Sequence, residues 1–417
     1  MADYLSESDP GTRILRRCDE LAAISRPGTG VTRLYLTGEH RAAMELVSRW
    51  MREAGMTVHT DHAANVIGRY PPAAGGRNGS LLLGSHIDSV IDAGKYDGPL
   101  GVIAAIDCIA VLNGEGRRLP FGIEILAFGD EEGTRFGTTL IGSRAVAGTL
   151  TPQDLAIRDK DNISVETALR TFGLDPNALA SAARSPGDVL AYVELHIEQG
   201  PVLEGEDLPV GVVTAINAQT RKVVTLKSEA NHAGTVPMRL RHDPFLAAAE
   251  IALALEKTAS GIPDAVGTVG QVDVRPGASN VIPGSVTMSL DMRARTDALL
   301  RRLTAAMDGE IERIAQARGV GLEVEPMLET KAAPCSPGLI GQLDRAIGGS
   351  GIKPLHLPSG AGHDGMAMNA LGPIAMLFVR CKGGVSHSPL ESVTAGDVTI
   401  AANVLRDFII GFDPEKS

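Results

Sequence analysis

The sequence contains few cysteines and few aromatic residues. Four cysteines lie far apart in 417 residues, and no two of them form a C-x-x-C pair. This spacing argues against a structural zinc site and against a disulfide framework, and it is typical of a protein of the reducing cytosol. Aromatic residues make up only 3% of the chain, whereas 48 glycines predict many tight turns and close backbone approaches.

Apolar runs of membrane-spanning length are also missing, and so is any excess of basic residues. No run reaches the roughly 20 apolar residues that a spanning helix needs. Residues 1–17 contain no apolar segment of the kind found in signal peptides. The net charge of −11 argues against a surface for nucleic acid or anionic membranes. We therefore expect a cytoplasmic protein whose partners include neither nucleic acid nor membrane.

The order of expected strands and helices predicts an α/β protein with two domains. A chain of this length is too long for one ordinary core. On both sides of residues 215–329, apolar strands alternate with helices, which predicts a doubly wound, mainly parallel sheet. Residues 215–329 themselves read as strand, helix, two strands, helix and strand, an order typical of the ferredoxin-like fold. We therefore predict a catalytic α/β domain from residues 1–214 and 330–417, with 215–329 inserted as an α+β domain.

Four expected strands end in residues of the kind that bind metals. The strands cover residues 81–83, 122–128, 189–195 and 373–379. Their ends, or the turns that follow, carry His86 and Asp97, Glu131 and Glu132, His196, and His387. Each has an ordinary explanation of its own, such as a solvated acidic turn, a core histidine or a turn cap. Because the carboxyl ends of parallel strands converge, their joint occurrence predicts one site.

Three imidazoles and two carboxylates are enough to hold two divalent ions that share one bridging carboxylate. Of the two adjacent glutamates, only one is expected to face a given ion. The other is then available as a general base and acid.

Six segments of the sequence resemble one known family, the amidase/hydantoinase–carbamoylase branch of the M20 metallopeptidase superfamily. They are GSHIDSV…GKYDGPLGV, GDEEGTRFG, ELHIEQGPVLE, ANHAGTVPM, PSGAGHDG and GGVSHSPLE. The branch includes N-carbamoyl-L-amino acid hydrolases, β-ureidopropionases and allantoate amidohydrolases, and the resemblance covers nearly the whole chain in order. It implies that the inserted domain is a lid and dimerisation domain and that the protein is a homodimer.

The resemblance implies two divalent metal ions, zinc or manganese, with cobalt and nickel as alternatives. The implied ligands are Asp97 as the bridge, His86 and His196 at one ion, and Glu132 and His387 at the other. A histidine at position 196 favours the carbamoylase branch, because the peptidase branches usually have a carboxylate there.

The resemblance also implies catalytic and substrate-binding residues. Glu131 is the implied general base, and Asp88 is implied to orient the His86 ring. In the inserted domain, His232 resembles the histidine that stabilises the oxyanion, from the partner subunit, and Arg293 resembles the group that binds the substrate carboxylate. Further polar contacts are implied for Asn280 and Gln199. Without the resemblance, Arg293 would be a surface ion pair and His232 a turn residue.

The glycine-rich segment at residues 359–365 lacks the spacing of a phosphate-binding loop. We expect it to close against the metal pocket, with His363 in a structural role rather than as a ligand.

These observations predict a dinuclear metal-dependent amidohydrolase. It would cleave the carbamoyl C–N bond of a small carboxylate substrate, allantoate or an N-carbamoyl-L-amino acid, and release ammonia. We favour allantoate or a similar ureido acid because the motifs contain no obvious apolar side-chain pocket. The alternatives are an aminoacylase or dipeptidase of the same superfamily, against which His196 argues, and a non-catalytic metabolite-binding relative, against which Glu131 argues.

Overall fold

The computed structural model describes residues 2–5 and 9–417, and the chain divides into two compact units. The first unit comprises Met1–Thr214, Cys335–Leu357 and Ala361–Ser417, and the second comprises Ala215–Pro334 with Pro358–Gly360. Each unit has its own hydrophobic core.

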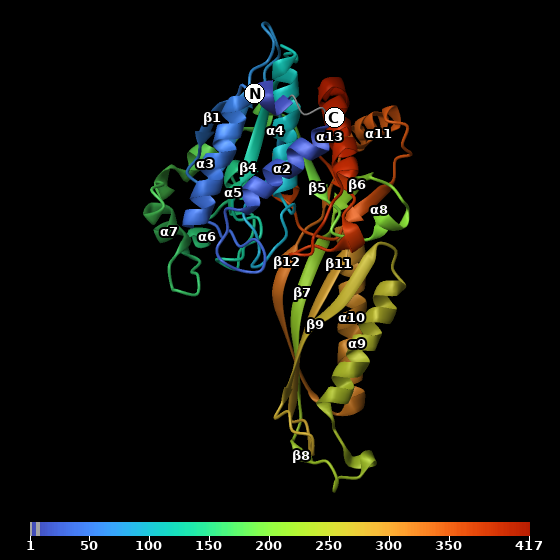
Figure 1. Ribbon diagram of the computed structural model, residues 1–417. Coiled ribbons are helices and arrows are strands. Elements are labelled where there is room, and N and C mark those ends of the chain that lie inside the picture. The colour runs from blue at the N-terminus through green and yellow to red at the C-terminus, as the bar shows by residue number, and fades with distance from the viewer. Residues whose placement is uncertain (1, 6–8) are drawn as a thin grey trace. The chain divides into compact units, whose positions relative to one another are not determined.

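A nine-stranded sheet organises the first unit (Figure 1). Its strands run in the order β1-β2-β4-β3-β5-β15-β6-β13, with β14 paired to β6. The central strands β4, β3, β5 and β15 are parallel, and the flanking pairs are antiparallel. The strands are β1 (Thr57–Thr60), β2 (Val66–Tyr70), β3 (Ser80–His86), β4 (Gly122–Phe128), β5 (Val189–Ile197), β6 (Val210–Ile216), β13 (Ala333–Pro334), β14 (His356–Ser359) and β15 (Ile374–Val379). The predicted α/β class with a mainly parallel central sheet is confirmed.

Helix α4 (Pro99–Gly114) packs against β3 and β5, and α2 (Pro10–Ala22) and α13 (Ala395–Gly411) pack against α4 (Figure 1). The residues of α4 are apolar on nearly every side, which predicts a helix enclosed by other elements, and nearly all of them are buried. Helix α3 (Gly38–Glu53) contacts β1 and β2 and follows the N-cap Thr37, whose side chain accepts from the His40 N–H.

The remaining helices of the first unit are short, apart from α11. They are α1 (Ala2–Leu5), α5 (Ile141–Val146), α6 (Pro152–Ala156), α7 (Val165–Thr171), η1 (Pro176–Ala182), η2 (Pro186–Asp188), α8 (Val202–Gly205), α11 (Pro337–Gly349), α12 (Gly365–Met368), η4 (Lys382–Gly384) and η5 (Pro414–Lys416). Four of these short helices, α6, α7, η1 and η2, follow one another between Pro152 and Asp188.

The second unit contains a four-stranded antiparallel sheet in the order β12-β7-β11-β9. Its main elements are β7 (Ala218–Lys227), α9 (Pro244–Ser260), β9 (Ala265–Arg275), β11 (Ser285–Ala294), α10 (Asp297–Arg318) and β12 (Gly321–Thr330). Alternate residues of β11 are buried in a core with α9 and α10, so one face of the sheet carries both helices. Two short strands, β8 (Asn231–His232) and β10 (Val281–Ile282), pair with each other, and η3 (Met238–Leu240) follows β8.

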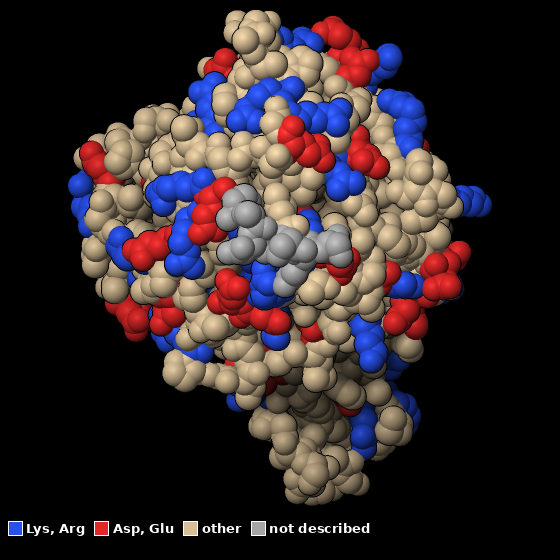
Figure 2. Space-filling view, turned by 45° about the horizontal axis from the view of Figure 1, so that its top comes forward, with Lys and Arg blue, Asp and Glu red and all other residues tan. Residues whose placement is uncertain are grey.

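Basic and acidic side chains are interspersed over the face drawn in Figure 2, rather than gathered by sign. In the part of the chain that the structure describes, no helix is both long and apolar enough to cross a membrane.

Candidate metal centre

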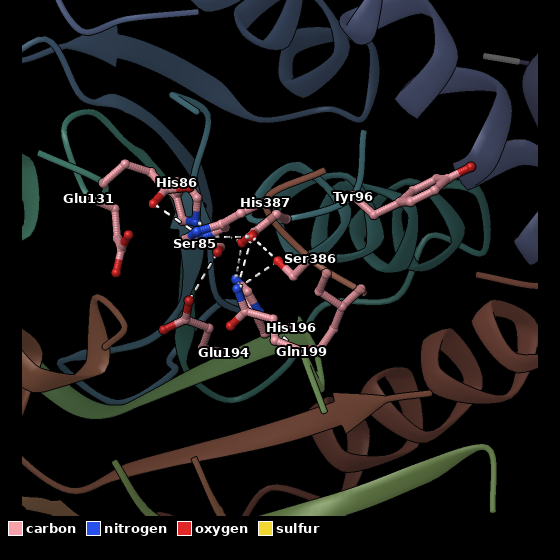
Figure 3. Close-up of polar contacts among 12 residues, drawn as sticks. Ser85, His86, Tyr96, Glu131, Glu194, His196, Gln199, Ser386 and His387 are labelled. Atoms are coloured by element: carbon pink, nitrogen blue, oxygen red, sulfur yellow. Dashed lines mark hydrogen bonds and ion pairs between the residues drawn. The ribbon is translucent and has the colours of Figure 1, made fainter. Parts of the chain in front are cut away.

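The predicted ligands come from the carboxyl ends of the parallel strands and from the loops that follow them. His86 ends β3, and His196 is the penultimate residue of β5. Glu132 follows β4, and His387 follows β15. Asp97 lies just before α4, which crosses back over the sheet. The structure brings these five side chains together within the first unit. Figure 3 labels the three histidines among them.

The carboxylate of Asp97 lies between two sets of donors. Its Oδ1 is 3.6 Å from His86 Nε2 and 3.2 Å from His196 Nε2. Its Oδ2 is 3.4 Å from His387 Nε2, which is itself 3.5 Å from Glu132 Oε2. The two oxygens of one carboxylate therefore face different ligand sets, as a bridging carboxylate would.

These donors suit divalent metal ions. Imidazole nitrogens and carboxylate oxygens without thiolates are accepted by zinc and manganese alike. Glu132 Oε1 is buried and has no hydrogen-bond partner, and buried His196 Nε2 forms no well-aligned hydrogen bond although Asp97 Oδ1 lies 3.2 Å away. Such atoms would be costly in an ordinary core, whereas a cation would satisfy them.

The ionisation of the site reflects many carboxyl groups in a small buried volume. Burial and the neighbouring Asp97 raise the pKa of Glu132 to about 8. Burial also raises the pKa of Glu131 well above its usual value, and Glu132 adds to this effect. Burial would raise the pKa of Asp97 too, but the imidazoles of His196 and His86 hold it well below its usual range. Positive charge at this centre therefore stabilises its carboxylates.

Asp88 contacts the site through different atoms from those expected. The prediction was that its carboxylate orients the His86 ring. Its Oδ1 is 3.7 Å from His86 Nδ1, whereas its main-chain oxygen is closer, at 3.2 Å. The carboxylate accepts hydrogen bonds from the backbone N–H groups of Glu131 at 3.1 Å and Glu132 at 3.3 Å. Asp88 thus holds the turn that carries both glutamates.

Gln199, predicted to contact substrate, lies beside Asp97. Its Nε2 donates to Asp97 Oδ2 at 2.8 Å and to Ser386 Oγ at 3.0 Å. Ser386 in turn donates to Asp97 Oδ2 at 2.6 Å. The sequence analysis did not predict a role for Ser386, although its position next to the predicted ligand His387 could have indicated one.

Backbone strain also marks this region. Asp130, Gln199 and His387 have φ angles of 63°, 57° and 53°, in the left-handed region that non-glycine residues seldom adopt. Such conformations persist where the surrounding structure holds them, and they cluster at functional sites.

Glu391 is a second residue that the sequence analysis missed. Its Oε1 accepts from the backbone N–H groups of Tyr96 at 2.7 Å and Asp97 at 3.1 Å, and so fixes the loop that presents Asp97. Burial and the charge of Asp97 raise the pKa of Glu391 to about 7. Nothing in the local sequence indicates this contact, which joins residues almost 300 positions apart.

His363 is buried, and its ring packs edge-on against the His196 ring, with 4.5 Å between ring centroids. One of its ring nitrogens also lies in a cluster with Glu194 and His196. The packing of the His363 ring against the His196 ring agrees with the predicted structural role.

The remaining predicted residues belong to the second unit and lie in two places. His232 is exposed on β8, and the backbone oxygen of Asn280 accepts from the Ala233 N–H at 2.9 Å. Arg293 is near the opposite end of the sheet, because β11 begins at Ser285, beside the paired strands β8 and β10. The strand rise from Ser285 to Arg293 alone is roughly 26 Å.

Arg293 lines a cavity of about 560 Å³ in the second unit. The cavity is lined by Arg221, Val266, Thr268, Gly270, Gln271, Ser289, Asp291, Arg293, Met327 and Gly360. Arg293 donates to both carboxylate oxygens of Asp291, at 2.8 and 3.0 Å, and to the Gly360 oxygen at 2.7 Å. Burial would raise the pKa of Asp291, but hydrogen bonds from Arg293 and Arg221 outweigh it and lower that pKa.

Comparison with known proteins gives consistent matches over the chain. The model of peptidase family M20/M25/M40 matches residues 82–411. An N-carbamoyl-L-amino acid amidohydrolase of Geobacillus stearothermophilus is 45% identical over 95% of this chain and 97% of its own length. An allantoate deiminase of Arabidopsis thaliana is 39% identical over 94% of this chain and 81% of its own length. The crystal structure of a hydantoinase/carbamoylase family amidase from Burkholderia multivorans superposes with a TM-score of 0.89 at 32% identity, covering 96% of this chain and 97% of that one.

Proposed function

Because this chain belongs to peptidase family M20/M25/M40, we propose that it is a dinuclear metal-dependent amidohydrolase that cleaves the carbamoyl C–N bond of a small ureido acid. The observation that carries the proposal is the Asp97 carboxylate, whose two oxygens face separate sets of imidazole and carboxylate donors. His86 and His196 would hold one ion, Glu132 and His387 the other, with Asp97 shared. When bound, two divalent ions polarise the scissile carbonyl and lower the pKa of water.

Glu131 is the proposed general base. It is buried next to Glu132, and its backbone is fixed by Asp88. Its carboxylate would take a proton from the attacking water and pass it to the departing nitrogen, and its raised pKa suits a group that must both accept and donate. Water is consumed, the C–N bond breaks, the terminal carbamoyl nitrogen leaves as ammonia, and the carbamic acid that remains loses carbon dioxide.

The inserted unit is the proposed lid, and Arg293 is the proposed site for the substrate carboxylate. A guanidinium forms two parallel hydrogen bonds to a carboxylate, as Arg293 does with Asp291. His232 would stabilise the oxyanion, with Asn280 as a further polar contact. A small substrate cannot span the roughly 26 Å between the two ends of one sheet. We therefore infer that His232 and Asn280 serve the site of a partner subunit.

A homodimer through the second unit is supported by its surface. Phe245, Leu246 and Leu253 on α9 are 45%, 38% and 66% exposed, and the last two lie seven residues apart on one face of the helix. Strand β9, which contacts α9, is an edge strand of eleven residues with unpaired backbone groups. Long edge strands and apolar stripes are normally covered, and a second copy of this chain would cover both.

The substrate class is a ureido acid, and allantoate is favoured over N-carbamoyl amino acids with large apolar side chains. The cavity around Arg293 is lined mostly by polar and charged residues, with Val266 and Met327 as its large apolar members. A second ureido group would suit this lining better than a hydrocarbon chain would. The four described cysteines are free and buried, which supports a cytoplasmic location.

Ammonia release by the purified protein tests the proposal. The protein is stripped with a chelator, reconstituted with manganese or zinc, and offered allantoate, N-carbamoyl-L-amino acids, N-carbamoyl-β-alanine and a dipeptide. We expect metal-dependent ammonia from at least one ureido acid. Cleavage of the dipeptide alone would establish the aminoacylase or dipeptidase alternative, and no reaction with any of the four would favour a metabolite-binding protein.

A further inference from the structure

Glu194 lies on β5, two residues before His196, and its side chain is fully buried. Residues two apart on a strand share a face, so Glu194 points to the same side of the sheet as His196. We propose that Glu194 is a positioning residue that holds the His86 and His196 imidazoles in place for one metal ion. The inference rests on the proposed function, since it concerns the metal ion that these two histidines would bind.

Three donors from three segments converge on the Glu194 carboxylate. Ser85 Oγ donates to Oε1 at 2.9 Å (Figure 3). Tyr192 OH donates to Oε2 at 3.0 Å, and the backbone N–H of Gly365 donates to the same oxygen at 3.3 Å. The carboxylate therefore joins β3, β5 and the start of α12.

The hydrogen bond between Ser85 and Glu194 lies just beyond the last backbone pair of strands β3 and β5. After a register shift between Ser80 and Leu81, strands β3 and β5 pair from Leu81 to Leu83, and the last described pair joins Leu83 to Val193. The next residues of β3 include Ser85 and His86, and those of β5 include Glu194 and His196. The Ser85–Glu194 hydrogen bond thus fixes the spacing of the two strand ends that carry the imidazoles.

The hydrogen bond from Gly365 to Glu194 ties the segment that carries His363 to the strand that carries His196. Gly365 follows His363 by two residues, and the His363 ring packs against the His196 ring. Oxygen and nitrogen atoms of Glu194, His196 and His363 lie within 4.8 Å of one another. Partners of this kind, which orient metal ligands without touching the metal, change metal affinity by about 10–100-fold when mutated.

A buried carboxylate with three donors can also serve stability alone, and Asp107 provides the matched comparison. It is buried on α4 and accepts from Tyr4 OH at 2.7 Å and from Arg13 Nε and Nη2 at 3.0 and 2.9 Å. None of these partners adjoins a predicted metal ligand in the sequence. Asp107→Asn therefore reproduces the loss of a buried carboxylate without disturbing the centre.

The experiment compares the full-length wild type, Glu194→Gln and Asp107→Asn. Metal-free protein is titrated with Co²⁺ while its visible absorption is followed, and melting temperatures are measured without metal. We expect the wild type to bind two ions. In Glu194→Gln one ion should bind about 10–100-fold more weakly with an altered absorption spectrum, because the amide has one acceptor oxygen and cannot accept from Ser85 at one position and from Tyr192 and Gly365 at the other. Asp107→Asn should lower the melting temperature and leave both affinities and the spectrum unchanged.

The inference is overturned if Glu194→Gln binds both ions within twofold of the wild type and with the same spectrum, whatever its melting temperature. If that variant does not fold, Ser85→Ala decides, since it removes one donor and keeps the carboxylate. Weaker binding of one ion supports the inference, and unchanged binding rejects it. A wild type that binds no metal would instead reject the proposed function.

Discussion

At the residue scale, the adjacent glutamates 131 and 132 differ in their surroundings. Glu132 faces His387 and shares its set of donors with Asp97, whereas Glu131 lies in a cluster with Glu132 and His86. Replacing Glu131 by Gln keeps the shape of the side chain and removes its ability to accept a proton. We expect kcat to fall by about 10²–10⁴ or more, with metal content unchanged, as measured by ammonia release and elemental analysis.

The matched control is Glu132→Gln, which should lose metal as well as activity because a carboxylate ligand becomes a weaker neutral donor. If Glu131→Gln keeps wild-type turnover, the assignment of the general base is wrong.

Another residue-scale prediction concerns His40, which lies on α3 and is not one of the predicted metal ligands. It is fully buried, and its Nδ1 accepts from the Leu36 N–H at 3.3 Å. Burial, together with the charges of Arg33 and Arg41, lowers the pKa of His40 to about 3. Below about pH 6.5 the unfolded chain binds a proton at this residue that the folded chain does not, so folding stability falls as the pH falls towards 3.

The measurement is urea unfolding of the wild type and His40→Asn at several pH values, since the amide oxygen can replace Nδ1 as the acceptor. As the pH is lowered from 6.5 to 5, the free energy of unfolding of the wild type should fall by up to about 1.4 kcal/mol per pH unit more than that of the variant. Parallel curves for the two proteins would show that His40 is not the responsible group.

The residues of the centre were predictable from the sequence to different degrees. His86, Glu132, His196 and His387 follow apolar strands, and a parallel sheet brings strand ends together. Their supporting groups were not predictable. Ser386 reaches Asp97 across 289 residues, and Ser85 reaches Glu194 across 109, so these contacts depend on side-chain directions that only the folded sheet determines.

At the element scale, the apolar stripe of α9 is expected to form the subunit interface. Leu253→Glu places a charge at its most exposed position. We expect this variant to be a monomer at micromolar concentrations where the wild type is a dimer, because burying an unpaired carboxylate is costly. Light scattering after size-exclusion chromatography measures the difference.

Val324→Glu is the control for that variant. Val324 is 40% exposed on β12, at the opposite edge of the same sheet, and its replacement should leave the oligomeric state unchanged. Dissociation by Val324→Glu, with Leu253→Glu still dimeric, would place the interface at β12 instead.

Most elements could be predicted from apolar periodicity, and the exceptions have identifiable causes. The strand at 122–128 has the predicted bounds. Strand β6 was missed although Val210–Ile216 is almost entirely apolar. It lies antiparallel between β15 and β13, outside the alternation of strand and helix on which the prediction relied. Two-residue strands such as β8 and β13 carry too few residues for any periodicity.

At the scale of the whole molecule, the separation of His232 from Arg293 predicts shared active sites. The test mixes two separately purified variants, Glu131→Gln and His232→Ala. Each variant alone should be nearly inactive. A mixed dimer would contain one complete site, with Glu131 from one chain and His232 from the other. After random exchange, activity should recover to about a quarter of the wild type, because half of the dimers are mixed and each has one working site.

Ammonia release before and after subunit exchange measures this recovery, with Glu131→Gln mixed with itself as the control. Absence of recovery, with exchange verified by mass spectrometry, would mean that His232 serves its own chain.

The position of β15 in the sheet has a consequence for how the chain is made. On the ribosome, β5 and β6 emerge early, but β15, the strand that separates them, emerges more than 150 residues later, followed by His387. The four strands of the β12-β7-β11-β9 sheet are by then already synthesised, and they come from one continuous segment. Because domains fold as units during synthesis, we expect the inserted unit to fold first and the metal centre to be completed last.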